Sequence, residues 1–151
     1  WRDLQAALPI KHILAGQPAS YPNSLRAEAC VAGGAWKWSG VHFEWLTPFK
    51  ETDKVKDNDK SCVLRVISHG HALLLTGDLS QEGEKILVQR YNQRLSSQVL
   101  VLGHHGSSSA SNINFIEAVS PRYAIASVGY VNPYHHPHNR VMALLGKKNI
   151  C

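Results

Sequence analysis

The sequence predicts an α/β fold in which β-hairpins come first and strands then alternate with helices. Residues 36–46 and 61–76 each contain two strand-like apolar stretches joined by a turn with glycine, which is typical of a hairpin. After residue 80, helix-like apolar spacing occurs three times, and strand-length apolar runs separate these segments. This order predicts helices layered on a mixed sheet.

The first half of the chain provides the hairpins. In WKWSGVHFEWL the turn falls at Ser39-Gly40, and Val41, Phe43 and Trp45 share one face because side chains alternate along a strand. We interpret the tryptophans here as core or hairpin packing rather than as a ligand-stacking surface. We also expect a helix that ends before Pro9, strands at 11–16, 25–31, 61–67 and 72–76, and loops at 17–23 and 47–60.

The second half of the chain alternates strands and helices. Residues 80–94 form the first expected helix, with Ser80 as its N-cap and with Leu87, Tyr91 and Leu95 spaced by four on one face. The remaining expected elements are buried strands at 98–102 and 123–128 and helices at 112–119 and 139–146, the last with Gly146 at its C-terminal end.

Composition sets limits on the class of protein. The chain has 151 residues, 44% of them hydrophobic, which is enough for the core of one domain or part of one. No apolar run approaches the roughly 18 residues that a membrane-spanning helix needs, and no signal-peptide pattern is visible. The net charge of +5 is compatible with an anionic partner, although the basic residues are scattered rather than clustered.

The three cysteines do not indicate a zinc site. Cys30, Cys62 and Cys151 lack the CxxC spacing that structural zinc sites use. They are compatible with one disulfide and one free thiol, or with three buried thiols, and composition alone favours the thiols slightly.

Three groups of polar residues follow apolar strands. Asp78 comes after ALLLTG, His104 and His105 come after VLVLG, and the histidines of YHHPH come after the strand at 123–128. Ligand sites of α/β sheets collect at such strand ends. Carboxylate and imidazole groups that converge there are what a divalent metal of borderline hardness needs. Each group alone is weak evidence, and their shared position at one edge of a sheet is what indicates a site.

The series LLLTGD, then VLVLGHHGSSSASNINFIEAVSPRYAIASVG, then NPYHHPH resembles the metallo-β-lactamase-like domain of the ComEC family of competence DNA-uptake proteins. NDKSCVLRV resembles the Asn-x-x-Ser strand entry of that family, and WKWSGVHFEWLTP resembles the hairpin of its Gram-negative members. The resemblance implies a metallo-β-lactamase-like, αββα layered fold, of which this chain is the C-terminal half.

The resemblance also implies roles for individual residues. Asp78 is similar to the metal-bridging aspartate. Either His104 or His105 is similar to the late metal-ligand histidine, and the other histidine would support that ligand without contacting the metal. His136 resembles a substrate-phosphate or acid/base residue at the rim of the pocket, and Asn58 a polar pocket residue. Ser107, Ser108 and His138 are expected to bind substrate, because hydroxyl and backbone N–H groups hold phosphate oxygens.

One departure from the family changes the expectation. The superfamily carries its principal metal motif, His-x-[His/Asp]-x-Asp-His, early in the domain, and this chain contains no such motif. We therefore expect residues 1–151 to be a partial domain that begins after that motif. Zinc and manganese sites usually need at least three protein ligands, so we expect the divalent metal to bind the full domain, and this chain alone to be inactive and without bound metal.

The resemblance implies a function and a location. The full domain would be a metal-dependent nuclease or phosphodiesterase that acts on incoming DNA, in a protein of the bacterial inner membrane whose domain faces the periplasm. Oxidation is permitted there, so a Cys30–Cys62 disulfide becomes the favoured pairing. The expected partners are DNA, the membrane-embedded remainder of the protein and, because half a fold leaves one face uncovered, a second copy of the chain.

Two other functions remain open at this point. The domain could guide or scaffold DNA at the uptake channel without cutting it, because a fold does not determine a function. It could also be another metallo-hydrolase, such as an extracellular phosphorylcholine esterase, although NPYHHPH and the Gram-negative hairpin argue against that assignment.

Overall fold

The computed structural model describes residues 2–49 and 56–151. Its helices and strands follow the expected order: α1 Arg2–Ala7, β1 Leu14–Ala15, β2 Glu28–Ala29, β3 Ala35–Trp38, β4 Val41–Trp45, β5 Leu64–Ser68, β6 His71–Leu75, α2 Gln81–Tyr91, β7 Val99–Val101, α3 Ile113–Val119, β8 Tyr123–Ile125 and α4 Asn139–Lys147. Short 3₁₀ turns occur at Pro18–Ser20, Asn23–Leu25, Asp57–Lys60, Asn92–Leu95 and Gly103–Gly106. None of the described helices is both long and apolar enough to cross a membrane.

A six-stranded mixed sheet forms the centre of the molecule. Its strand order is β3-β4-β5-β6-β7-β8; the pairs from β3 to β6 are antiparallel, and β6, β7 and β8 run parallel. The hairpin turns Ser39-Gly40 and His69-Gly70 have positive φ at both residues, the geometry that matches the twist of a tight hairpin. Helices α2 and α3 supply the long connections that parallel strands require. The predicted mixed α/β fold is therefore confirmed.

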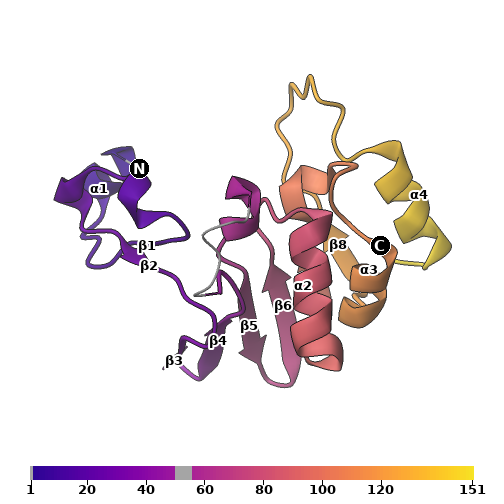
Figure 1. The fold of residues 1–151 in the computed structure, drawn as a ribbon, viewed down its shortest axis with the longest axis horizontal. Coiled ribbons are helices and arrows are strands. Elements are labelled where there is room, and N and C mark those ends of the chain that lie inside the picture. The colour runs from indigo at the N-terminus through magenta and orange to yellow at the C-terminus, as the bar shows by residue number, and fades with distance from the viewer. Residues whose placement is uncertain (1, 50–55) are drawn as a thin grey trace.

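The core lies between one face of the sheet and helices α2 and α3 (Figure 1). Leu74 of β6 and Leu100 of β7 are fully buried there. Leu87 of α2 packs into the same core together with Phe115 and Ile116 of α3. The four-residue spacing of the α2 sequence thus corresponds to its buried face. Ser80 caps that helix as predicted, because its hydroxyl accepts a hydrogen bond from the Glu82 N–H.

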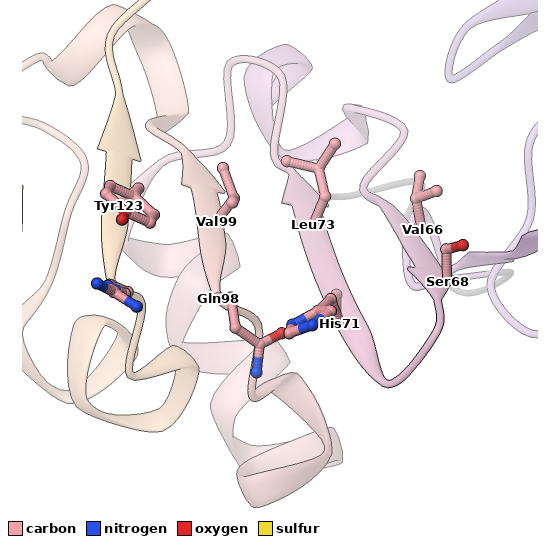
Figure 2. Close-up of a pocket in the computed structure, with 9 residues that line it drawn as sticks. Val66, Ser68, His71, Leu73, Gln98, Val99 and Tyr123 are labelled. Carbon is pink, nitrogen blue, oxygen red and sulfur yellow. The ribbon is translucent and has the colours of Figure 1, made fainter.

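The opposite face of the sheet has no covering layer among the described residues. One row of paired residues crosses all six strands on this face: Trp36, Phe43, Val66, Leu73, Val99 and Tyr123. Figure 2 shows the side chains of this row on β5 to β8 pointing to the same side, where they line an open cavity of about 400 Å³. An apolar surface of this extent is typical of a face that packs against another protein layer.

Several expectations differ in detail from the structure. Strand β8 is at the edge of the sheet, so Tyr123 and Ile125 are exposed rather than buried. Gly146, by contrast, lies in the last turn of α4, one residue before the helix ends, as predicted. Trp36 and Trp38 are exposed, so the hairpin-packing interpretation holds and the core interpretation does not: Trp36 stacks on Phe43 with ring centroids 4.9 Å apart. Of the expected loop at 47–60, residues 50–55 lie outside the described residues.

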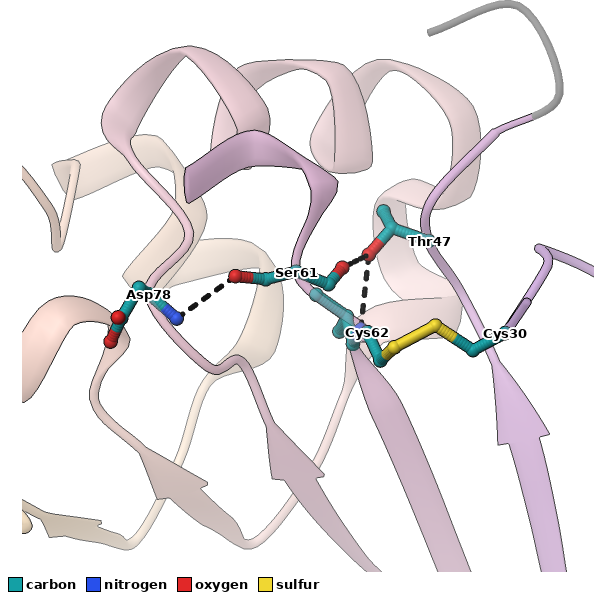
Figure 3. Close-up of a disulfide and its surroundings, with 6 residues drawn as sticks. Cys30, Thr47, Ser61, Cys62 and Asp78 are labelled. Atoms are coloured by element: carbon teal, nitrogen blue, oxygen red, sulfur yellow. Dashed lines mark hydrogen bonds between the residues drawn. A yellow bond between two sulfur atoms is a disulfide. The ribbon is translucent and has the colours of Figure 1, made fainter. Parts of the chain in front are cut away.

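A disulfide joins the N-terminal segment to the main sheet. The segment contains α1 and a small parallel sheet of β1 and β2, and Cys30, directly after β2, is bonded to Cys62 in the approach to β5. This is the pairing that the resemblance implies. Figure 3 shows the bridge beside the Ser61–Asp78 contact. Cys151 is an exposed free thiol.

We expect loss of this disulfide to lower the free energy of unfolding. The bond closes a loop between residues 32 apart in sequence, and the chain-entropy relation gives a stabilisation of about 4 kcal/mol for that length. The double variant Cys30→Ala/Cys62→Ala and the reduced wild type should therefore both unfold at lower urea concentration. Cys151→Ala is the control and should unfold as the wild type does. Equal midpoints for all four samples would contradict the stabilising role.

We also expect the isolated chain to self-associate through its uncovered sheet face. The weight-average mass from sedimentation should rise with concentration, and Leu73→Lys should suppress that rise because the charge sits in the middle of the apolar row. A concentration-independent monomer with a cooperative melt would contradict this expectation.

Candidate functional site

The loops that follow the three parallel strands lie together at the carboxyl ends of these strands, which form one edge of the sheet. Asp78 lies in the loop after β6, His104 and His105 in the loop after β7, and the segment 126–138 connects β8 to α4. Because the strands are parallel, their carboxyl ends lie together, which is where open α/β sheets bind ligands. The structure therefore places all three polar groups of the sequence on the same edge.

An aspartate and a histidine form the centre of this edge. The His105 Nε2 lies 3.6 Å from the Asp78 Oδ1, and each side chain is 52% exposed. The other ring nitrogen, Nδ1, lies 2.7 Å from the backbone carbonyl oxygen of Ser127. A carbonyl only accepts, so His105 Nδ1 must carry a proton and donate it there. A neutral His105 then presents an Nε2 lone pair to Asp78, which is how metal-ligating histidines are held in proteins.

The backbone of the histidine loop is left-handed over three successive residues. His104, His105 and Gly106 have φ values of 48°, 59° and 78°. This conformation costs about 1 kcal/mol or more for each residue that has a side chain. At position 106 a side chain does not fit, because a Cβ would lie 2.7 Å from the Cβ of Pro137. The small residues of GHHGSSS thus allow the tight bend that points His105 at Asp78.

Asp78 is held by the segment before β5. Its backbone N–H donates a 3.1 Å hydrogen bond to the Ser61 hydroxyl oxygen, and the Ser61 carbonyl accepts one from Thr47, as Figure 3 shows. Asn58, the predicted pocket residue, lies half-buried in the 3₁₀ turn of the same segment. The neighbouring Asp59 turns inward to Ser80 and accepts hydrogen bonds from its N–H and its hydroxyl at 2.9 and 3.0 Å.

A buried carboxylate that the sequence analysis missed fixes the far end of the histidine loop. Glu84 of α2 is 1% exposed, and its two oxygens accept hydrogen bonds from the N–H groups of Ser111 and Asn112 at 2.7 and 2.6 Å. In the sequence, Glu84 is an ordinary acidic residue in the first turns of a helix. The sequence contains one indication, because Glu84 follows Gly83 and a glycine within a helix indicates close packing. In the structure, a Cβ at position 83 would lie 2.4 Å from the Leu79 side chain.

Burial raises the pKa of Glu84 from 4.5 to about 7, although the hydrogen bonds from Asn112 and Ser111 and the charge of Arg140 act in the opposite direction. The negative charge of Asp59 adds a smaller increase to this pKa. Ionised Glu84 is therefore less favourable in the folded protein than in the unfolded chain, and stability depends on its protonation.

His136 lies near the histidine loop. Its ring centroid is 6.2 Å from that of His104 and 5.9 Å from that of Tyr134, on which it stacks. His104 itself contacts the Ser109 hydroxyl at 3.2 Å through Nδ1. The structure thus brings His104, His105 and His136 together beside Asp78.

The other predicted substrate-binding residues have structural contacts. His138 caps α4, because its Nδ1 accepts a hydrogen bond from the Arg140 N–H. The hydroxyl of the buried Ser107 contacts that of Ser109 at 3.0 Å. Ser108 is exposed, and its carbonyl oxygen accepts hydrogen bonds from Gln81 and Arg140. Binding of substrate by His138, Ser107 and Ser108 remains a prediction.

The described residues provide two candidate metal ligands, Asp78 and His105, rather than a complete metal site. No group of three or more His, Cys, Asp or Glu side chains in the described parts of the chain has the arrangement of a metal centre. The fixed lone pair of His105 and the carboxylate of Asp78 fit a divalent metal as a pair of donors. A tetrahedral zinc site requires at least one more protein ligand, which would have to come from outside these residues.

Comparison with curated proteins identifies close relatives by sequence. The chain is 52% identical over 140 residues to competence protein ComA of Neisseria gonorrhoeae, a match that covers 90% of the chain and 20% of that protein. It is 37% identical to recombination protein 2 of Haemophilus influenzae, over 77% of the chain and 14% of that protein. It is 33% identical to ComE operon protein 3 of Bacillus subtilis, over 87% of the chain and 17% of that protein.

The chain thus spans about a fifth or less of the curated relatives it matches. No model of a known protein family matches it. Among solved structures, a metallo-β-lactamase superfamily protein of Thermotoga maritima matches 91% of this chain and 72% of its own length, with 15% identity and a TM-score of 0.46.

We expect Glu84→Gln to change how stability depends on pH. The wild-type folded state binds the Glu84 proton more tightly than the unfolded chain does, so its stability should fall as pH rises from 4.5 to about 7. The loss is about 3 kcal/mol over that window. A glutamine side chain does not titrate, so the free energy of unfolding of the variant, although lower overall, should lack this part of the slope.

Urea unfolding at a series of pH values measures this difference. Glu82→Gln is the matched control, because Glu82 lies on the same helix with its carboxyl exposed. Parallel stability curves for wild type and Glu84→Gln between pH 4.5 and 7 would show that Glu84 does not titrate in this range.

Proposed function

We propose that this chain, which belongs to the ComEC-type competence proteins, forms part of a domain that processes incoming DNA. The observation that carries the proposal is the Asp78–His105 pair, with His105 fixed so that its Nε2 faces a carboxylate. A relative named competence protein ComA matches 90% of the chain at 52% identity, and ComE operon protein 3 matches 87% of the chain at 33% identity. The chain spans only a fifth or less of the length of these relatives, so the proposed activity belongs to the larger domain of which this chain is a part.

Asp78 and His105 would hold one side of a divalent metal, zinc or manganese, and the remaining ligands would come from the parent protein. His105 is favoured over His104 because only its Nδ1 is committed to a backbone carbonyl, which leaves Nε2 as the coordinating atom. Such a metal polarises a phosphoryl oxygen and lowers the pKa of its bound water. Residues 1–151 would then be a partial domain that is inactive alone.

The other residues of the edge would bind and protonate the phosphodiester. His136 lies at the rim, held by ring contacts to Tyr134 and His104, where it would donate a proton to the leaving oxygen. Asn58 and Ser108 would donate hydrogen bonds to phosphate oxygens. Ser107, whose hydroxyl contacts that of Ser109, would fix the shape of the pocket. His138 uses its Nδ1 to cap α4, so its Nε2 would contact the substrate.

A DNA-guiding module without catalysis is the second candidate function. It is favoured by the finding that the described residues contain no complete metal centre. In that case the same edge would bind DNA phosphates without cleaving them, and the Asp78–His105 contact would be an ion pair on the surface.

The remaining partners follow from the surface and the disulfide. The net charge of +5 suits a DNA partner.

The apolar row on the uncovered sheet face would pack against the remainder of the parent protein or, in the isolated chain, against a second copy. The Cys30–Cys62 bond supports an oxidising compartment such as the periplasm, with the parent held in the inner membrane.

The full-length protein that contains this segment should cleave DNA in the presence of manganese or zinc. Asp78→Ala and His105→Ala should each reduce the rate about 100-fold or more, because each removes a metal ligand, whereas His104→Ala should reduce it about 10-fold or less. His71→Ala, at the exposed first residue of β6 and so at the opposite end of that strand from Asp78, serves as the control. The assay compares cleavage of single-stranded and double-stranded substrates with each metal.

Two results would redirect the proposal. Absence of cleavage with any divalent metal, together with retained DNA binding, would favour the guiding module. Full activity in His105→Ala with loss of activity in His104→Ala would show that the two histidines have the opposite roles.

A further inference from the structure

A cavity lies directly beside the Asp78–His105 pair. It has a volume of about 240 Å³, and its walls include His105, Val128, Val131, Pro133, Tyr134 and His136. Except for His105, these residues come from the segment between β8 and α4, which projects beyond the edge of the sheet in Figure 1. One wall of this cavity is therefore a candidate metal ligand, and the other walls are largely aromatic and aliphatic.

The projecting segment exposes aromatic and aliphatic side chains. Tyr134 is 77% exposed, Val131 85%, and Tyr130 is fully exposed. Water-exposed apolar side chains grouped on one loop mark a surface that binds something. Here the exposed side chains lie next to the polar residues Asp78 and His105. A matching ligand would therefore carry a flat or apolar part next to a charged part.

The rings form a column that leads into the site. Tyr134 stacks on His136 with their planes 18° apart, and His136 meets His104 edge-on at 6.2 Å. One face of Tyr134 is thus already occupied by a ring, and the exposed remainder of its side chain is available to a further planar group. Stacking columns of this kind accept nucleobases without regard to sequence, because every base has a π-face.

We propose that this cavity is a nucleobase subsite, in which a base of single-stranded DNA stacks on Tyr134 while its phosphate lies next to His105, at the metal that Asp78 and His105 would hold. The inference rests on the proposed function, because that function places the phosphate. A double helix keeps its bases stacked inside, so only an unpaired strand presents a base to Tyr134. The subsite therefore selects single strands at the entrance to the site.

Binding of short fluorescein-labelled DNA to the full-length protein that contains this segment, measured by anisotropy before cleavage begins, tests this subsite. Three probes of equal length are used: an oligothymidylate, the same sugar-phosphate strand without bases, and a duplex. The oligothymidylate should bind about 10-fold more tightly than the base-free strand, which is the range expected for base stacking. Tyr134→Ala should remove that difference, and Tyr134→Phe should retain it.

Two controls separate stacking from folding and from charge. Tyr21→Ala replaces an exposed tyrosine of the N-terminal segment and should bind all three probes as the wild type does. The dependence of affinity on salt should be the same for Tyr134→Ala and wild type, because it reports phosphate contacts. A Tyr134→Ala variant with an altered salt slope would indicate a disturbed phosphate site rather than a lost stack.

The base-free strand separates failure of the subsite from failure of the proposed function. Equal binding of the base-free and thymidine strands to the wild type would overturn the subsite and leave the proposed DNA function standing. Preference for the duplex would do the same. No binding of any DNA probe would overturn both, and would assign the exposed rings to contacts within the parent protein.

Discussion

Two backbone N–H groups in the loop after β7 donate hydrogen bonds to a single buried carboxylate, that of Glu84, and the candidate site depends on this contact. The loop has no regular secondary structure over most of its length, so its backbone polar groups need partners elsewhere. Glu84 fixes one end of the loop to α2, and the His104 N–H fixes the other end to the Gly77 carbonyl. Between these two points the chain has room for the left-handed bend that presents His105.

The approach to β5 provides the matching support on the other side of the site. Asp59 holds Ser80, Ser61 holds Asp78, and Cys62 is bonded to Cys30. This short stretch of chain therefore connects the N-terminal segment, the loop after β6 and the start of α2. Precise placement of functional groups needs support of this kind behind them, and here it comes from backbone and buried side-chain contacts rather than from the apolar core.

Features that depend on neighbouring residues could be predicted from the sequence. The Ser39-Gly40 turn, the Ser80 cap and the buried spacing of α2 all follow from contacts within a few positions along the chain. The edge shared by Asp78 and His105 was also predictable, because parallel strands bring their ends together. The sequence could not show that the Ser127 carbonyl, 22 residues later in the chain, contacts the His105 Nδ1, which is the contact that favours His105 over His104 in the proposed function. The roles of Asp59 and Glu84 and the exposure of β8 depend in the same way on distant contacts.

The left-handed bend at His104 and His105 lowers the stability of the protein, but it places the two imidazoles that the proposed chemistry uses. Glycine adopts this conformation without the strain that a histidine side chain adds, so the most stable version of this loop is one that has lost its imidazoles. A library of variants selected only for thermal resistance would therefore enrich glycine at these two positions and discard the imidazoles that the proposed function requires. Engineering of this protein for heat tolerance would need to protect residues 104 and 105 and seek its gains elsewhere.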